Sequence, residues 1–387
     1  MRIGIMGGTL DPVHSGHIQI AQVVMQALQL DQVMLLPAGD PPHKLNPTLK
    51  TDRLNMARLA ARDVPGMYVS DMEIEREGRT YTVDTLTELR RTRPDVCWYY
   101  IIGADTLDVL DTWRNFAEVA KLCEFAVVGR ADEAVSVGRM RDLEARYGAK
   151  FHPLDFCGPE ISSTEIRRRA AQGEDISALV PPAVRDYILK NGLYLSTKSR
   201  DEILNILKKT LKPVRFVHTL GVAETAVRLA ERFDVNPVKA ELAALLHDCA
   251  KYKPLDEMKK LVAEGCADAD AEEMETESVL HAPAGMVHAQ EEFGIQDPEI
   301  LSAIRKHTLG DVQMSALDAL IYTADFIEPN RKPFPGLEEV RALAESDIFA
   351  AAMKCAELTN RYVESQGRNA HPRTLSMLRS GIRNKEE

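Results

Sequence analysis

Residues 2–17 read RIGIMGGTLDPVHSGH, and this stretch decides the fold of the first half of the chain. It begins with a short apolar run that predicts a buried strand. Gly7 and Gly8 follow, and glycine lets backbone N–H groups come close to a bound anion. His14 and His17 stand where a helix should begin, and a helix start adds aligned N–H groups and a partial positive charge. Together these features indicate a site for nucleotide phosphates.

Alternating strand and helix patterns continue from this stretch through the first half. Apolar runs predict parallel strands at 2–6, 32–37, 67–72, 97–103 and 124–129. Amphipathic patterns predict helices at 16–29, 51–62, 82–92, 138–147, 163–172 and 182–190. Such alternation is typical of an open, doubly wound sheet whose ligand binds at the carboxyl ends of the strands. Gly7, Gly8 and the Gly103–Asp105 segment all follow predicted strand ends, so we expect them at one site.

The pattern changes near residue 199, after which helical periodicity prevails and strand signals almost vanish. Helices are predicted at 200–210, 215–233, 237–250, 254–264, 279–293, 297–307, 315–328, 337–365 and 370–384. We therefore predict an α/β parallel-sheet domain over 1–196 and an all-α domain over 197–387. The segment Asp268–Glu277 carries six acidic residues and no basic ones, and we expect a solvated loop there.

Composition sets limits on the class of protein. A chain of 387 residues is long for one hydrophobic core, which favours two domains. A net charge of −11 argues against non-specific nucleic-acid binding. No apolar run approaches the ~18 residues of a membrane helix, and no leader segment is visible. Six scattered cysteines without a CxxC pair favour a reduced, cytoplasmic chain, and a homo-oligomer stays open.

A second motif in the first half is ISSTEIRRR at 161–169. Ser162 and Glu165 have the spacing of a capping box, so a helix should begin there. The free N–H groups of that helix, the hydroxyls of Ser163 and Thr164, and the guanidinium of Arg167 would converge on an anion. Combined with the glycine turn and the two histidines, this motif strengthens the prediction of a triphosphate site.

With these motifs, residues 1–195 resemble the nucleotidyltransferases that carry HxGH and SSTxIR, and within them the nicotinate mononucleotide adenylyltransferases. The finer match lies in PPHK (41–44), YTVDTL (81–86), IIGAD (101–105), TWR (112–114) and NGLY (191–194). The resemblance implies a Rossmann-like fold and transfer of AMP from ATP to nicotinate mononucleotide, giving deamido-NAD and pyrophosphate. Leu10 departs from the phenylalanine that is usual in the family, an apolar exchange that should be tolerated.

The resemblance also implies roles for the matching residues. The reacting phosphates would meet His14, His17, Lys44 and Arg167. ATP would be held by Gly7, Gly8, Thr9, Gly103, Asp105, Ser162, Ser163 and Thr164, with Mg²⁺ on the triphosphate. Nicotinate would lie against Thr82 and Trp113. Such a transfer needs positioning and charge stabilisation and no protein nucleophile.

The second half contains a spaced set of histidines and aspartates that suit a metal centre. The set is His218, His247, Asp248, His281, His307 and Asp325. Imidazole and carboxylate suit iron, manganese or zinc. Six such donors exceed one tetrahedral metal, so two metals bridged by Asp248 fit better, and two-metal sites hydrolyse phosphate bonds. We expect His247 and Asp248 inside a helix, with Lys251 on the same helix face.

This H…HD…H…H…D pattern resembles the HD-domain phosphohydrolases. The runs HTLGVAETA (218–226), LLHDCAKYK (245–253), HTLG (307–310) and TADFIEPNR (323–331) are similar to the YqeK family. That resemblance implies symmetrical cleavage of diadenosine tetraphosphate (Ap4A) to two ADP at two divalent metals, iron first and manganese or zinc otherwise. The six donors would be the metal ligands, and Lys251 and Arg331 would contact phosphates.

The sequence hypothesis is therefore a bifunctional enzyme whose partners are ATP, nicotinate mononucleotide and Ap4A. Two alternatives stay open. One half is a catalytically silent nucleotide sensor or scaffold, or both halves act on other substrates: another nucleotidyl acceptor in the first, another nucleotide phosphate in the second.

Overall fold

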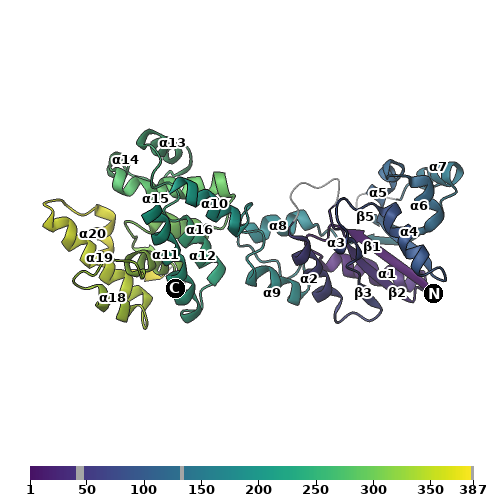
Figure 1. Ribbon diagram of the computed structural model, residues 1–387, viewed down its shortest axis with the longest axis horizontal. Helices are drawn as coiled ribbons and strands as arrows, with labels where there is room; N and C mark the ends of the chain where they lie inside the picture. The colour runs from purple at the N-terminus through teal and green to yellow at the C-terminus, as the bar shows by residue number, and fades with distance from the viewer. Residues whose placement is uncertain (41–47, 131–134, 385–387) are drawn as a thin grey trace. The chain divides into compact units, whose positions relative to one another are not determined.

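The computed structural model describes residues 1–40, 48–130 and 135–384, which form two compact units (Figure 1). The first unit comprises residues 1–170 and 174–189, and the second comprises 171–173 and the chain from 190 onward. The second compact unit thus begins a few residues before the predicted domain boundary at 196. The boundary between independently folding domains stays a prediction.

The first unit contains a six-stranded parallel sheet with the strand order β3-β2-β1-β4-β5-β6. Its strands are β1 (Arg2–Gly8), β2 (Gln32–Pro37), β3 (Met67–Val69), β4 (Cys97–Gly103), β5 (Glu124–Arg130) and β6 (Phe151–Gly158). The five predicted strands are present, with β3 shorter than expected. The sequence analysis missed β6 because Pro153 and Asp155 interrupt its apolar pattern. An edge position, where the register shifts after Val128, tolerates that proline.

Strand order places the predicted site at a topological switch point. The chain moves from β1 outward through β2 to β3, then crosses back beside β1 and proceeds through β4 to β6. Right-handed crossovers in opposite directions put their helices on opposite faces of a sheet, and ligands bind where the direction reverses. The ends of β1 and β4 flank this point, and they carry Gly7, Gly8 and Gly103.

The helices of the first unit include all those predicted and several short additional ones. They are α1 (Ser15–Ala27), α2 (Lys50–Ala61), α3 (Met72–Glu75), α4 (Thr82–Thr92), α5 (Ala104–Val109), the 3-10 turn η1 (Leu110–Thr112), α6 (Phe116–Leu122), α7 (Val137–Tyr147), α8 (Ser163–Ala171) and α9 (Pro182–Lys190). A core of Ile3, Trp98, Phe125 and their neighbours is shared between the sheet and the apolar faces of α4, α6 and α7. Helix α1 contacts β1 and β6, and α2 contacts β2 and β3.

The second unit is helical, as predicted, apart from a two-residue parallel pairing of β7 (Gln313–Met314) with β8 (Arg383–Asn384). Its helices are α10 (Arg200–Thr210), α11 (Pro213–Arg232), α12 (Pro237–Leu246), α13 (Leu255–Gly265), α14 (Ala271–Glu275), α15 (Glu277–Phe293), α16 (Pro298–Lys306), α17 (Ala316–Ile327), α18 (Leu337–Leu343), α19 (Ile348–Ser365) and α20 (Pro372–Ser380). Helices α11, α12, α16 and α17 pack on one another around a common apolar core.

Three predicted helices end early or are broken. The helix predicted over 370–384 ends at Ser380 in α20, and Arg383–Asn384 form β8. Helix α12 ends at Leu246, and His247 and Asp248 lie in the turn that follows rather than inside a helix. Bonds from Cys249 N–H to Leu246 O and from Lys251 N–H to Asp248 O tighten this turn. The predicted helix 337–365 is broken between α18 and α19, because the Asp347 side chain accepts the N–H groups of Phe349 and Ala350 and begins a new helix.

The segment 268–277 is solvated as expected except at Glu273, but it contains a short helix and is not a plain loop. Asp270 caps the short helix α14 through the N–H groups of Glu272 and Glu273. The Glu273 side chain is fully buried, and its two oxygens accept from the Arg305 guanidinium at 2.7 and 2.8 Å. The composition of the segment could not reveal this pairing, because Arg305 comes from α16 and is far away in the sequence.

We expect Glu273→Ala to destabilise the second unit by about 3–5 kcal/mol, because it removes the two-pronged partner of the buried Arg305 charge and leaves it only the exposed Asp268. Urea unfolding of the full chain, followed by its helical signal, measures the loss. Glu275→Ala is the matched control: Glu275 is 77% exposed beside Lys259, and its loss should cost at most about 1 kcal/mol. Equal effects of the two substitutions would contradict a structural role for the buried pair.

Candidate nucleotide site and candidate metal centre

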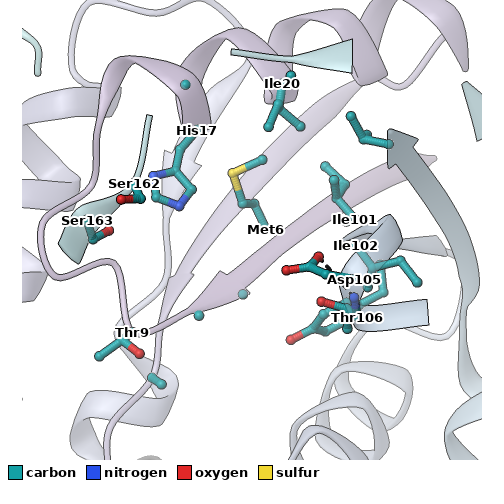
Figure 2. A pocket seen from close by; sticks show the side chains of 18 of the residues that line it. Met6, Thr9, His17, Ile20, Ile101, Ile102, Asp105, Thr106, Ser162 and Ser163 are labelled. Atoms are coloured by element: carbon teal, nitrogen blue, oxygen red, sulfur yellow. Dashed lines mark hydrogen bonds between the residues drawn. The ribbon is translucent and has the colours of Figure 1, made fainter. Parts of the chain in front are cut away.

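A cleft of about 660 Å³ opens at the carboxyl ends of β1 and β4 (Figure 2). It brings together most residues predicted for the first site, namely Gly7, Gly8, Thr9, His14, His17, Thr82, Gly103, Asp105, Trp113, Ser162, Ser163 and Thr164. In Figure 2 His17 lies with Ser162 and Ser163 on one side of the cleft, and Asp105 lies with Thr106 on the other. Arg167 is not among the lining residues, and Lys44 lies outside the described residues.

His14 and His17 cap helix α1 for each other. His14 is the N-cap residue, and its Nδ1 accepts the N–H of His17 at 3.3 Å. The Nδ1 of His17 accepts the N–H of His14 at 3.2 Å. A neutral imidazole that accepts at Nδ1 carries its proton at Nε2. The backbone therefore fixes both rings, whose centroids are 3.6 Å apart, in the form that donates from Nε2.

Sterics require glycine at the last two positions of β1. A Cβ on Gly7 would lie 2.1 Å from the Oη atom of Tyr100 on the neighbouring strand. Gly8 has a φ of +149°, which L side chains rarely adopt. The sequence analysis assigned both glycines to phosphate approach. The structure adds that Gly7 also makes room for Tyr100, whose burial raises the pKa of its hydroxyl.

The start of α8 is tied to the loop that follows β1. The Ser163 hydroxyl donates to Pro12 O at 2.9 Å, and Arg167 Nη1 donates to Asp11 O at 2.7 Å. Ser162 Oγ accepts the N–H of Glu165 at 3.2 Å, as a capping residue should. Ser163 and Arg167, which were predicted to contact phosphates, thus contact backbone carbonyl oxygens here. These bonds join the start of α8 to the loop between β1 and α1.

The other end of the cleft is lined by aromatic side chains. Trp113 lies half-buried and edge-on to Tyr100, with ring centroids 5.4 Å apart. Thr82 is the first residue of α4, so free N–H groups of that helix start adjoin the cleft. Asp105 is exposed in α5, and its Oδ1 accepts the N–H of Thr106. This end of the cleft therefore combines aromatic side chains with the backbone N–H groups of a helix start.

Arg53 is a positioning residue that sequence reasoning missed. Its side chain is buried and donates to the carbonyl oxygens of Thr9, Gly39 and Thr48, which belong to the loops beside the cleft. An arginine in an amphipathic helix usually indicates a surface position. The available signal was its helical spacing from the apolar residues Met56, Ala57 and Ala60.

All six predicted metal ligands meet in the second unit. His218 comes from α11, His281 from α15 and Asp325 from α17, while His247, Asp248 and His307 follow the ends of α12 and α16. Their donor atoms form three overlapping groups, each within 4.8 Å: His218–His247–Asp248, His247–His307–Asp325 and Asp248–His281–His307. Asp248 is almost fully buried, a costly position for a carboxylate without partners.

Three of the four histidines are oriented for metal binding by their Nδ1 atoms. His247 Nδ1 is 2.5 Å from Ala244 O, His307 Nδ1 is 2.8 Å from Ile304 O, and His218 Nδ1 is 3.1 Å from Glu328 Oε1. Each Nδ1 faces an oxygen acceptor and so carries the proton, which leaves the Nε2 lone pair directed into the cluster. Burial lowers the pKa of His281 to about 4, whereas the carboxylates of Asp248 and Asp325 outweigh burial and raise the pKa of His247. The donor set therefore fits divalent transition metals.

Asp248 has the geometry of a bridging ligand. Its Oδ2 is 3.2 Å from His247 Nε2, whereas its Oδ1 is 3.2 Å from His281 Nε2 and 3.7 Å from His307 Nε2. The two oxygens therefore face different histidines. On the far side of the cluster, Asp325 Oδ1 lies 2.9 Å from His218 Nε2. This arrangement supports two metal positions that share Asp248.

Cationic side chains surround these carboxylates. Lys251 Nζ lies 3.9 Å from Asp248 Oδ1 and 3.0 Å from His281 Nε2, through a turn and not through a helix face as expected. Arg331 donates to Asp325 Oδ1 at 2.8 Å. Sequence reasoning missed Arg215, 2.9 Å from Asp248 Oδ2, and Glu328, the partner of His218. Glu328 stands three residues after Asp325 in the TADFIEPNR run, and that spacing was the available signal.

Comparisons with known proteins match the two units separately. The Cytidylyltransferase-like family model matches residues 5–169, and the HD domain model matches residues 215–330. A probable nicotinate-nucleotide adenylyltransferase of a Synechococcus strain is 42% identical over 196 residues, which is 50% of this chain and 95% of that protein. The symmetrical bis(5'-nucleosyl)-tetraphosphatase of Bacillus subtilis is 43% identical over 177 residues, which is 46% of this chain and 94% of that protein.

A Mycoplasma genitalium protein matches both units at once. Named probable nicotinate-nucleotide adenylyltransferase/Ap4A hydrolase, it is 28% identical over 370 residues, covering 94% of this chain and 98% of its own length.

Within the described residues, no helix combines the length and apolar character that crossing a membrane requires.

We expect Glu328→Ala to weaken metal binding by about 10- to 100-fold, because His218 loses the carboxylate that orients it. Bound metal, measured after dialysis against graded chelator concentrations, tests this. Glu328→Gln keeps an acceptor and should lose less, and Glu338→Ala, at an 82% exposed side chain, should lose nothing. Unchanged metal affinity in both Glu328 variants, with folding verified by circular dichroism, would remove Glu328 from the centre.

Proposed function

The chain belongs to the nicotinate-nucleotide adenylyltransferases over its first half and to the HD-domain symmetrical bis(5'-nucleosyl)-tetraphosphatases over its second, and on that premise we propose that one polypeptide carries two activities. The first half transfers AMP from ATP to nicotinate mononucleotide, giving deamido-NAD and pyrophosphate. The second half hydrolyses Ap4A symmetrically to two ADP. We place the independent domains at 1–196 and 197–387, in the cytoplasm, where the free thiols of the described cysteines stay reduced.

Positioning carries the first reaction. The phosphate of nicotinate mononucleotide attacks the α-phosphorus of ATP in line, and pyrophosphate leaves without a protein nucleophile. His14 and His17 donate from Nε2 to the crowded α-phosphate, where negative charge builds up. Gly7, Gly8, Thr9 and the 162–164 segment hold the triphosphate, with Mg²⁺ and Lys44 neutralising it. Arg167 keeps the loop before α1 in register with α8.

The nicotinate group occupies the aromatic end of the cleft. Trp113 stacks on its pyridine ring, and the N–H groups at the start of α4, near Thr82, receive its carboxylate. Asp105 accepts a ribose hydroxyl. The observation that carries the assignment of the first half as an adenylyltransferase is the mutual capping of His14 and His17 inside the cleft. It gives two Nε2 donors for one phosphate position.

The second reaction takes place at the six-ligand cluster. Six side chains would hold two divalent metals, iron first with manganese or zinc as alternatives: His218, His247, Asp248, His281, His307 and Asp325. When bound, the metals would supply Lewis acidity toward the central phosphoanhydride. Lys251 and Arg331 bind phosphate oxygens on either side of that bond. Three inward-facing Nε2 atoms together with a carboxylate shared between two histidine groups support this reading.

Two other readings predict different behaviour. A half that is a silent sensor or scaffold needs no intact set of reactive groups. The phosphate-site residues of the first half and the six proposed ligands of the second half are both present, which disfavours this reading. A different substrate in either half changes products but not the residues required. A panel of nicotinate mononucleotide, nicotinamide mononucleotide and phosphopantetheine with ATP, and of Ap4A, ADP and guanosine polyphosphates alone, separates these readings by chromatography.

We expect His17→Ala to slow deamido-NAD formation by about 100- to 1,000-fold, because a preorganised donor to the transition state is lost. Ap4A hydrolysis by the same protein should be unaffected. His17→Asn keeps a short side-chain acceptor for the cap but has no Nε2 donor, so it should be as slow as the alanine variant. Near-normal synthesis by His17→Ala would refute the assignment of the first site.

We expect Asp248→Ala to abolish Ap4A hydrolysis and to lower bound metal, because it removes the shared ligand. Metal content per chain and ADP release are the two measurements. Deamido-NAD formation serves as the internal control and should stay within about twofold of the parent protein, since Asp248 belongs to the other compact unit. Purified protein that binds none of iron, manganese or zinc and resists chelators would overturn the second assignment.

A further inference from the structure

Besides Lys251 and Arg331, a third cation contacts the candidate metal centre, and the proposed function gives it no role. Arg215, in the first turn of α11, places Nη1 2.9 Å from Asp248 Oδ2, and its side chain is one quarter exposed. Lys251 reaches the other oxygen of the same carboxylate. Arg331 Nη2 lies 2.8 Å from Asp325 Oδ1, so three cations contact the two carboxylates of one cluster. Metals bound to Asp248 would satisfy that carboxylate and leave these cations for an added anion.

An exposed aromatic ring adjoins this cationic rim. Tyr252 follows Lys251 directly and is 41% exposed. Lys212 Nζ, one turn before Arg215, lies 4.5 Å from the centroid of the Tyr252 ring. Two contacts, Arg215–Asp248 and Lys212–Tyr252, therefore hold residues 212–217 beside the turn 248–253. Val214 and Val217 on the first turns of α11 are also exposed, at 84% and 51%.

This surface combines the two contacts that a nucleotide needs. Guanidinium and ammonium groups bind phosphate oxygens, and an aromatic ring beside aliphatic side chains binds the face of a base. Arg331 contacts the other carboxylate of the cluster, Asp325. Arg215 and Arg331 therefore contact the cluster at two different carboxylates, Asp248 and Asp325. A dinucleotide cleaved at its middle extends one nucleoside diphosphate to each side.

We propose that the surface formed by residues 212–217 and 248–253 binds one nucleoside-diphosphate half of the substrate, with Arg215 on its phosphates and the Tyr252 ring stacked on its base. The proposal rests on the dinucleotide hydrolysis proposed above and specifies how the substrate is held. Arg331 is left to the phosphates of the other half.

Steady-state kinetics of the metal-loaded full chain with Ap4A test the two contacts. Tyr252→Leu should raise KM about tenfold and leave kcat within about twofold, whereas Tyr252→Phe should resemble the parent. Arg215→Gln should also raise KM about tenfold, with its metal content unchanged. Tyr362→Leu, at a 63% exposed tyrosine of α19, and Arg228→Gln, on the far part of α11, are matched controls expected to change neither constant. An unchanged KM in both Tyr252→Leu and Arg215→Gln overturns the proposal.

Photolabelling with 8-azido-ADP locates the base without relying on turnover. In the metal-loaded full chain, label should appear in peptides that contain 212–217 or 249–255, and Tyr252→Leu should reduce it. Label in the second unit only outside these peptides overturns the proposal. Label at Tyr252 in a protein that does not cleave Ap4A would instead refute the proposed hydrolysis and support the same surface as a site for another nucleotide.

Discussion

In five of the six histidines of the two candidate sites, a hydrogen bond at Nδ1 determines what the Nε2 atom can do, and both sites depend on it. In the first unit the Nδ1 atoms of His14 and His17 accept backbone N–H groups, so Nε2 carries the proton and donates. In the second unit the Nδ1 atoms of His247 and His307 face carbonyl oxygens, so Nε2 presents a lone pair. The backbone thus leaves one set of imidazoles with a proton on Nε2, as phosphate binding requires, and the other set with an Nε2 lone pair, as metal binding requires.

Each fold brings these rings together by a different route. In the α/β unit a reversal of strand order places the ends of β1 and β4 side by side, so a short loop can supply glycines and histidines at once. In the helical unit the donors come from separate helices and helix ends, and the close packing of α11, α12, α16 and α17 brings them within bonding range. One site is therefore local in sequence, and the other depends on tertiary packing.

The sequence predicted the fold class of both halves and five of the six strands, because buried strands and amphipathic helices have clear periodicity. It also identified His14 and His17 and the six proposed ligands, whose residue types are unusual at such positions. It missed β6, whose proline suits an edge strand, and the buried Glu273, whose partner Arg305 is far away in the chain. Arg215 and Glu328 escaped for the same reason: each contacts its partner across a tertiary interface that periodicity does not report.

The packing of Tyr100 against Gly7 has a consequence for how such proteins diverge. The tyrosine hydroxyl occupies the space that any side chain at position 7 would need. Position 7 is therefore free to vary only in relatives in which position 100 carries a smaller side chain, and the two positions should change together. The glycine at position 7 is then kept in part by packing against a neighbouring strand and not by the ligand alone, so its loss in a relative need not mean loss of the site.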